Sequence, residues 1–72
     1  MIVSLTRVGE NMASHPIAHP SDAMQVLSYL RKSGYSASDE KLIAHFGINK
    51  RTLNDIVQKL LNEDAVTVSG GG

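Results

Sequence analysis

Side chains suited to nucleic-acid contact gather in one short part of this 72-residue chain. Lysine and arginine neutralise phosphates, a hydroxyl near a helix N-terminus can bind them, and asparagine or glutamine can pair with adenine. Asn54 and Gln58 are four residues apart, so on a helix both project from the same side. The candidate contact residues are Lys41, Asn49, Lys50, Arg51, Thr52, Asn54, Gln58 and Lys59.

The formal charge of the chain is balanced, with 7 basic and 7 acidic side chains. A neutral chain is a poor non-specific nucleic-acid binder, because phosphate neutralisation drives that binding. The charges are unevenly spread, since residues 31–59 carry 6 basic and 3 acidic groups (+3), which leaves −3 for the rest. Asp55 opposes phosphate contact within the candidate segment, unless it accepts a hydrogen bond from cytosine. Arg7, Arg31 and Lys32 could extend the contacts, although the last two also suit the C-terminal end of a helix.

The histidines do not form a recognisable metal site. His15 and His19 are four apart, but Pro16 and Pro20 disfavour the helix that would align them. No cysteine is present, and His45 is expected to face solvent. The chain also lacks a nucleophile motif and a phosphate-binding glycine loop followed by a helix. We therefore expect no metal, no cofactor and no enzymatic activity.

Local signals predict three helices that would position the candidate residues. The first begins after Ser21 and ends near Gly34, and the second runs from Ser38 to Gly47. The third begins after Asn49, and apolar residues recur at helical spacing through all three. The predicted buried positions are Ala23, Val26, Leu27 and Leu30, then Leu42, Ile43 and Phe46, then Leu53, Ile56, Val57, Leu60 and Leu61.

The two ends of the chain carry weaker β signals. Residues 1–8 are rich in β-branched and aliphatic side chains, which predicts a strand or a frayed arm. Residues 9–20 read as a linker, because a glycine and two prolines interrupt any helix there. Residues 35–37 could form a minimal strand, and residues 65–69 read as another. Residues 70–72 are expected to be a flexible tail.

The segment LIAHFGINKRTLNDIVQKLLNEDAVTV resembles the winged helix-turn-helix domains of transcription regulators. In that family Leu42, Phe46, Ile48, Leu53 and Ile56 would set the angle between the two helices, and Gly47 would be the glycine of the turn. The resemblance covers about residues 21–69 and implies a mainly α fold with a small β-sheet, a three-helix winged helix-turn-helix with an abbreviated wing.

Two features depart from the family pattern. Ile43 stands where alanine is common, and the chain has no returning strand after residues 65–69 to complete a wing hairpin. Because a lone strand would expose an unpaired edge, we expect residues 2–8 to supply its partner. Pairing between two chains is the alternative, and it would make a dimer.

The resemblance implies a DNA-binding transcription regulator whose helix at about 49–63 enters the major groove of double-stranded DNA. A single copy carries few cations, so we expect a homodimer that reads two half-sites. The alternative is a winged-helix module that binds another protein, which the neutral charge, Asp55 and the missing wing favour. The absence of cysteine, of a signal sequence and of a membrane-length apolar run leads us to expect a cytoplasmic protein.

Overall fold

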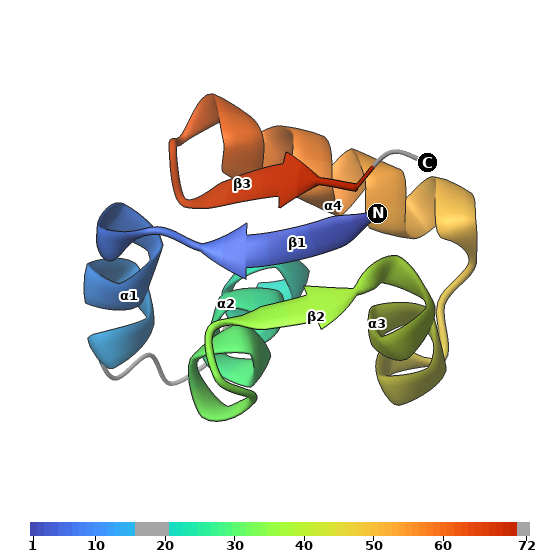
Figure 1. Cartoon of the computed structure of the whole chain (residues 1–72), viewed down its shortest axis with the longest axis horizontal. Helices are drawn as coiled ribbons and strands as arrows, with labels where there is room; N and C mark the ends of the chain where they lie inside the picture. The colour runs from blue at the N-terminus through green and yellow to red at the C-terminus, as the bar shows by residue number, and fades with distance from the viewer. Residues whose placement is uncertain (16–20, 71–72) are drawn as a thin grey trace.

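The structure of the chain is a computed structural model that describes residues 1–15 and 21–70. Four helices and a small antiparallel sheet make up this part of the chain, and the helices leave one face of the sheet open (Figure 1). The prediction of a mainly α fold with a small sheet is confirmed, but the predicted number of three helices is wrong. The elements are β1 (Ile2–Leu5), α1 (Arg7–Ser14), α2 (Asp22–Lys32), β2 (Ser36–Ser38), α3 (Asp39–Phe46), α4 (Lys50–Asn62) and β3 (Val66–Ser69).

The N-terminal strand lies at the centre of the sheet, whose strand order is β2-β1-β3. β1 pairs antiparallel with both neighbours, so that Val3 lies opposite Ala37 on one side and Val68 on the other. The prediction that the N-terminal segment supplies the partner of residues 65–69 is confirmed. No hairpin follows α4 within the described chain, because the strand that pairs with β3 comes from the other end of the sequence.

One face of the sheet packs on helices and the other is polar. Val3, Ala37 and Val66 are buried, and α2 and α4 lie behind the strands in Figure 1. Side chains alternate between the two faces of a strand, so the neighbouring residues point to the open side. That side carries the exposed Ile2 at the centre of a hydroxyl-rich set, namely Ser4, Ser36, Ser38, Thr67 and Ser69.

The predicted helix boundaries are confirmed by their caps. The side chains of Ser21, Ser38 and Asn49 each accept a hydrogen bond from the backbone N–H three residues later. These bonds satisfy donors that the first turn of a helix leaves unpaired. Gly34 has φ +81°, and the backbone N–H of Tyr35 returns to the carbonyl of Leu30 at 2.8 Å to close α2.

The prediction of a linker over residues 9–20 is wrong for residues 9–14, which belong to α1. Thr6 caps this helix by accepting a hydrogen bond from the N–H of Gly9 at 3.1 Å. Gly9 does not break the helix but brings it against the turn between α4 and β3. A Cβ atom on Gly9 would lie 2.1 Å from the carbonyl oxygen of Ala65. Residues 16–20, 71 and 72 lie outside the described residues, and so does most of the predicted tail.

A single apolar core joins the helices to the sheet. Its centre consists of side chains with no more than 2% exposure, and half-buried residues such as Met12, Phe46 and Ile56 surround them. α1 contributes through Met12 and Ala13, so the unpredicted helix is part of this core. The fully buried large side chains are Val3, Val26, Leu27, Leu30, Leu42, Leu53 and Leu60.

Candidate nucleic-acid interface

The turn between α3 and α4 fixes the direction of α4. Gly47 adopts the left-handed conformation at φ +63°, and its N–H donates to the carbonyl of Ile43 at 2.9 Å. This conformation favours glycine, and it ends α3 within one residue. Ile48 then packs against the core, and Leu53 is fully buried one turn into α4. The apolar side of α4 is therefore anchored and its polar side faces outward.

All eight predicted contact residues are exposed, and no described segment covers the polar side of α4. Asn49 is the N-cap of α4, because its Oδ1 accepts a hydrogen bond from the backbone N–H of Thr52 at 2.7 Å. The amide nitrogen of Asn49 and the second lone pair of its Oδ1 remain available to a ligand. The other residues on the α4 side are Lys50, Arg51, Thr52, Asn54, Gln58 and Lys59.

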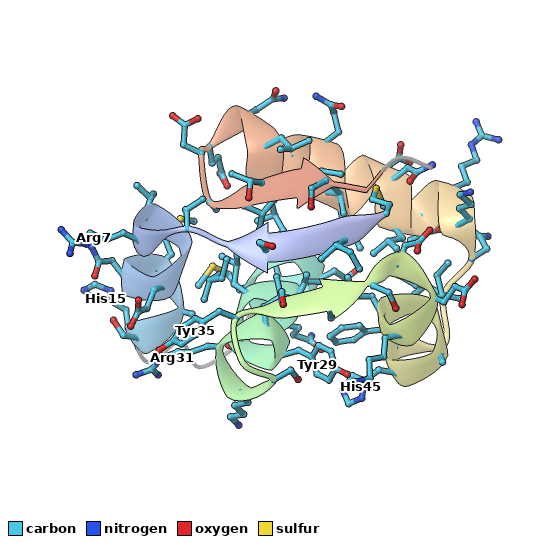
Figure 2. All side chains as sticks on the ribbon, in the orientation of Figure 1. Arg7, His15, Tyr29, Arg31, Tyr35 and His45 are labelled. Atoms are coloured by element: carbon cyan, nitrogen blue, oxygen red, sulfur yellow. The ribbon has the colours of Figure 1, made fainter. Side chains whose placement is uncertain are left out.

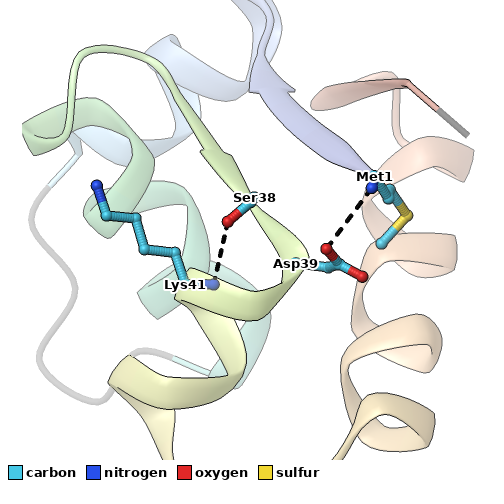
Figure 3. Close-up of polar contacts among 4 residues, drawn as sticks. All are labelled: Met1, Ser38, Asp39 and Lys41. Atoms are coloured by element: carbon cyan, nitrogen blue, oxygen red, sulfur yellow. Dashed lines mark hydrogen bonds and ion pairs between the residues drawn. The ribbon is translucent and has the colours of Figure 1, made fainter. Parts of the chain in front are cut away.

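Lys41 lies apart from these residues. It is in the first turn of α3, where its backbone N–H donates to the Oγ of Ser38 at 3.2 Å. Figure 3 shows its side chain extending from α3 on the side away from α4. The same turn is joined to β1, because the Met1 ammonium group lies 3.6 Å from a carboxylate oxygen of Asp39. The structure therefore does not bring Lys41 together with the α4 residues.

The outer side of α4 consists of two rows of residues spaced four apart, which project from the same side of a helix. One row begins with Lys50 and continues with amides, and the Nε2 of Gln58 donates to the Oδ1 of Asn62 at 3.4 Å. Asn62 extends the predicted site by one helical turn, and its spacing from Gln58 was the signal in the sequence. The rows are Lys50, Asn54, Gln58 and Asn62, and Arg51, Asp55, Lys59 and Glu63.

The charge at the start of α4 differs from that of the other helices. Acidic residues lie in the first turn of α1, α2 and α3, where the positive end of the helix dipole favours them. α4 has no acidic residue in its first turn and carries Lys50 and Arg51 there. These two cations face the positive end of the dipole, so they lower stability unless an anion binds beside them.

The positive charges of the chain do not all lie on one face. Figure 2 shows Arg7 and Arg31 at the α1 end of the molecule, near His15 and Tyr35. The start of α4 lies at the other end, next to α3 (Figure 1). The prediction that Arg7 and Arg31 could extend the contacts of α4 is therefore wrong for a single copy of the chain. At the same end of the molecule, the hydroxyl group of Tyr35 donates a hydrogen bond to a carboxylate oxygen of Glu10 at 3.3 Å.

An aromatic cluster joins α2 to α3. The rings of Tyr29 and His45 are stacked with centroids 4.2 Å apart, and Phe46 meets both rings edge-on. His45 is exposed, as predicted, but the stack with Tyr29 was not predicted from the sequence. Such ring pairs add to the packing of α3 on α2. The cluster therefore helps to hold the helix that precedes the α3–α4 turn.

No group of three His, Asp or Glu side chains could hold a metal ion within residues 1–15 and 21–70. The Nδ1 of His15 lies 2.7 Å from the carbonyl of Asn11, and His19 falls outside the described residues. In the same ranges, no helix has the length and apolar character needed to cross a bilayer. The expected absence of a metal or cofactor stays a prediction.

No protein-family model matches the chain, and no curated protein or solved structure matches it either.

Proposed function

We propose that the chain binds double-stranded DNA through α4 and acts as a transcription regulator of the winged helix-turn-helix kind. The observation that carries this proposal is the start of α4, where Lys50 and Arg51 replace the acidic residues found at the start of the other helices. A DNA phosphate at this helix end would meet two cations, free backbone N–H groups and the positive end of the dipole. The location implied by this function is the cytoplasm.

The α4 side chains would divide the work of recognition. Lys50, Arg51 and Thr52 would contact phosphates and set the position of the helix on the duplex. Asn54 and Gln58, exposed one turn further along, would reach base edges in the major groove. The opposing charge of Asp55 keeps the affinity of one copy low, so we propose that two copies bind together as a homodimer on paired half-sites.

A salt-dependent binding assay tests the proposal. Fluorescence anisotropy of a labelled 20-base-pair duplex, measured between about 50 and 200 mM salt, should show affinity that falls as salt rises. The double variant Lys50→Gln/Arg51→Gln should bind more weakly, with the salt slope reduced by about two units. The matched control is Arg31→Gln/Lys32→Gln, which removes the same charge from the end of α2.

The control variant makes the assay specific for α4. Equal weakening by both double variants would indicate a diffuse charge effect and would refute a site on α4. Absence of binding at about 50 mM salt would refute DNA binding altogether.

A second candidate function is docking to another protein. The observation that favours it is the alternation of charge along Arg51, Asp55, Lys59 and Glu63, which suits a mixed-charge protein surface better than a row of phosphates. Partner binding that persists in high salt, together with absence of DNA binding, would support this function over DNA recognition.

A further inference from the structure

A groove runs between the start of α2 and the middle of α4, on the helical side of the molecule. It consists of two adjoining hollows of about 110 and 320 Å³. Asp22 and Ile56 line both hollows, so the two are direct neighbours on the surface, and we call them together the groove. The groove is separate from the amide row of α4, because its α4 residues are Asp55, Ile56 and Lys59.

The smaller hollow has an apolar floor that water can reach. Phe46, Ile48 and Ile56 line it, and each is only partly buried, whereas Leu53 and Leu60 of α4 are completely buried. At about 110 Å³ the hollow is large enough to admit one aliphatic side chain. An aliphatic side chain placed there would remove apolar surface of all three residues from water.

The rim of the groove carries a net negative charge among the described lining residues, with Asp22 and Asp55 against Lys59. Asp22 and Asp55 reach it from two different helices, and neither makes an ion pair or hydrogen bond through its carboxylate with another described residue. Lys59 is the only cation among the described lining residues. A ligand with one positive charge would therefore complement this rim better than a phosphate would.

We propose that this groove binds a segment of another protein that presents an aliphatic side chain next to an arginine or lysine. The aliphatic side chain occupies the smaller hollow, against Phe46, Ile48 and Ile56. The basic side chain lies across the wider hollow, between the carboxylates of Asp22 and Asp55. This binding does not require DNA, since the hollow for the aliphatic side chain and Asp22 lie outside the outer rows of α4, although the groove shares Asp55 and Lys59 with one of those rows.

Amide chemical shifts of the ¹⁵N-labelled full chain provide the test. The probe is the peptide acetyl-ALRALR-amide, and the controls are acetyl-ALEALE-amide, which reverses the charge, and acetyl-ASRASR-amide, which removes the aliphatic side chains. The first peptide should shift signals of the start of α2, Phe46, Ile48 and the middle of α4. Neither control peptide should shift them, because each lacks one of the two required groups.

The variant Asp22→Asn/Asp55→Asn should bind the probe about three- to tenfold more weakly, as expected for two partly exposed ion pairs. The matched control is Glu40→Gln/Glu63→Gln, which removes two acidic groups that do not line the groove. The same Asp22→Asn/Asp55→Asn variant should bind DNA more tightly if the proposed function holds, because it removes two negative charges. Opposite effects on peptide and DNA separate the two proposals.

Three results would overturn the proposed groove function. The first is equal binding of the arginine and glutamate peptides, and the second is no shift with any peptide at millimolar concentration. The third is a concentration-dependent shift of the groove signals without peptide, which would assign the groove to a second copy of the chain.

Discussion

Replacement of Gly9 by alanine is the sharpest test of how α1 is attached to the fold. The added Cβ would lie 2.1 Å from the carbonyl oxygen of Ala65 and 2.8 Å from a methyl carbon of Leu5. The side chain of Leu5 can move, but the Ala65 carbonyl belongs to the backbone of the turn before β3. That carbonyl also accepts the N–H of Thr6 at 3.1 Å, and the Thr6 hydroxyl donates to the carbonyl of Asp64 at 2.6 Å.

The expected cost follows from two opposing effects. Alanine in a helix interior is more stable than glycine by about 0.5–1 kcal/mol, which favours the variant. Relief of the clash requires α1 to move away from the turn and to lose both Thr6 hydrogen bonds, each of which contributes about 0.5–1.5 kcal/mol. Overpacking of this kind costs about 1–3 kcal/mol. We expect a net loss of about 2 kcal/mol, or about 8–16 °C in Tm for a domain of this size.

Urea unfolding followed by circular dichroism measures this loss, with thermal melting as a second readout. The matched control is Gly34→Ala, because a Cβ atom on Gly34 meets nothing within 4 Å but the residue has φ +81°. The free energy of unfolding of this control should fall only by the cost of placing alanine in a left-handed backbone conformation, about 1–2 kcal/mol. A Gly9→Ala variant as stable as the wild type, or more stable, would refute the close contact between α1 and the α4–β3 turn.

Substitutions at three further places test α4 and the turn before it. Lys50→Gln/Arg51→Gln should raise the free energy of unfolding by up to about 1 kcal/mol, since both cations face the positive end of the helix dipole; a lower value in urea unfolding would contradict this placement. Asn49→Ala should lower the free energy of unfolding by about 1 kcal/mol, because the helix cap is lost, whereas Asn49→Asp should keep the cap. Equal thermal stability of the two variants would argue against a capping role of Asn49. Gly47→Ala should cost about 1–2 kcal/mol because Gly47 has φ +63° in open space, and Gly47→Asn should cost less in the same urea assay.

Much of the helical structure could be predicted from the sequence, because its signals are local. Ser21, Ser38 and Asn49 each bond to a backbone N–H only three residues away, so the residue type alone marks the helix start. Gly47 marks the turn for the same reason, since its left-handed backbone involves only its neighbours. The exposed rows of α4 also follow from the helical period, which places polar residues opposite Leu53, Val57 and Leu60.

The N-terminal part of the chain was harder to predict. Gly9 reads as a helix breaker, yet its lack of a side chain admits the Ala65 carbonyl from a turn more than fifty residues later. Thr6 was the local signal for this helix, because it caps α1, but the β-rich residues before it favoured a strand or arm. The spacing of apolar residues within residues 1–15 does not indicate a contact with the α4–β3 turn. The packing partner of α1 could therefore not be predicted from the sequence.

The sequence by itself determined where α2, α3 and α4 begin and which side of α4 is polar, because capping bonds and helical periodicity act within a few residues. Only the tertiary structure decided which groups meet across the chain. In that structure the Met1 ammonium group pairs with Asp39, and Lys41 and Arg31 lie away from the outer side of α4. Asp22 and Asp55 come from different helices and line the same groove. Those outcomes depend on the angles at which whole helices pack on the sheet, which the core as a whole sets and no single segment encodes.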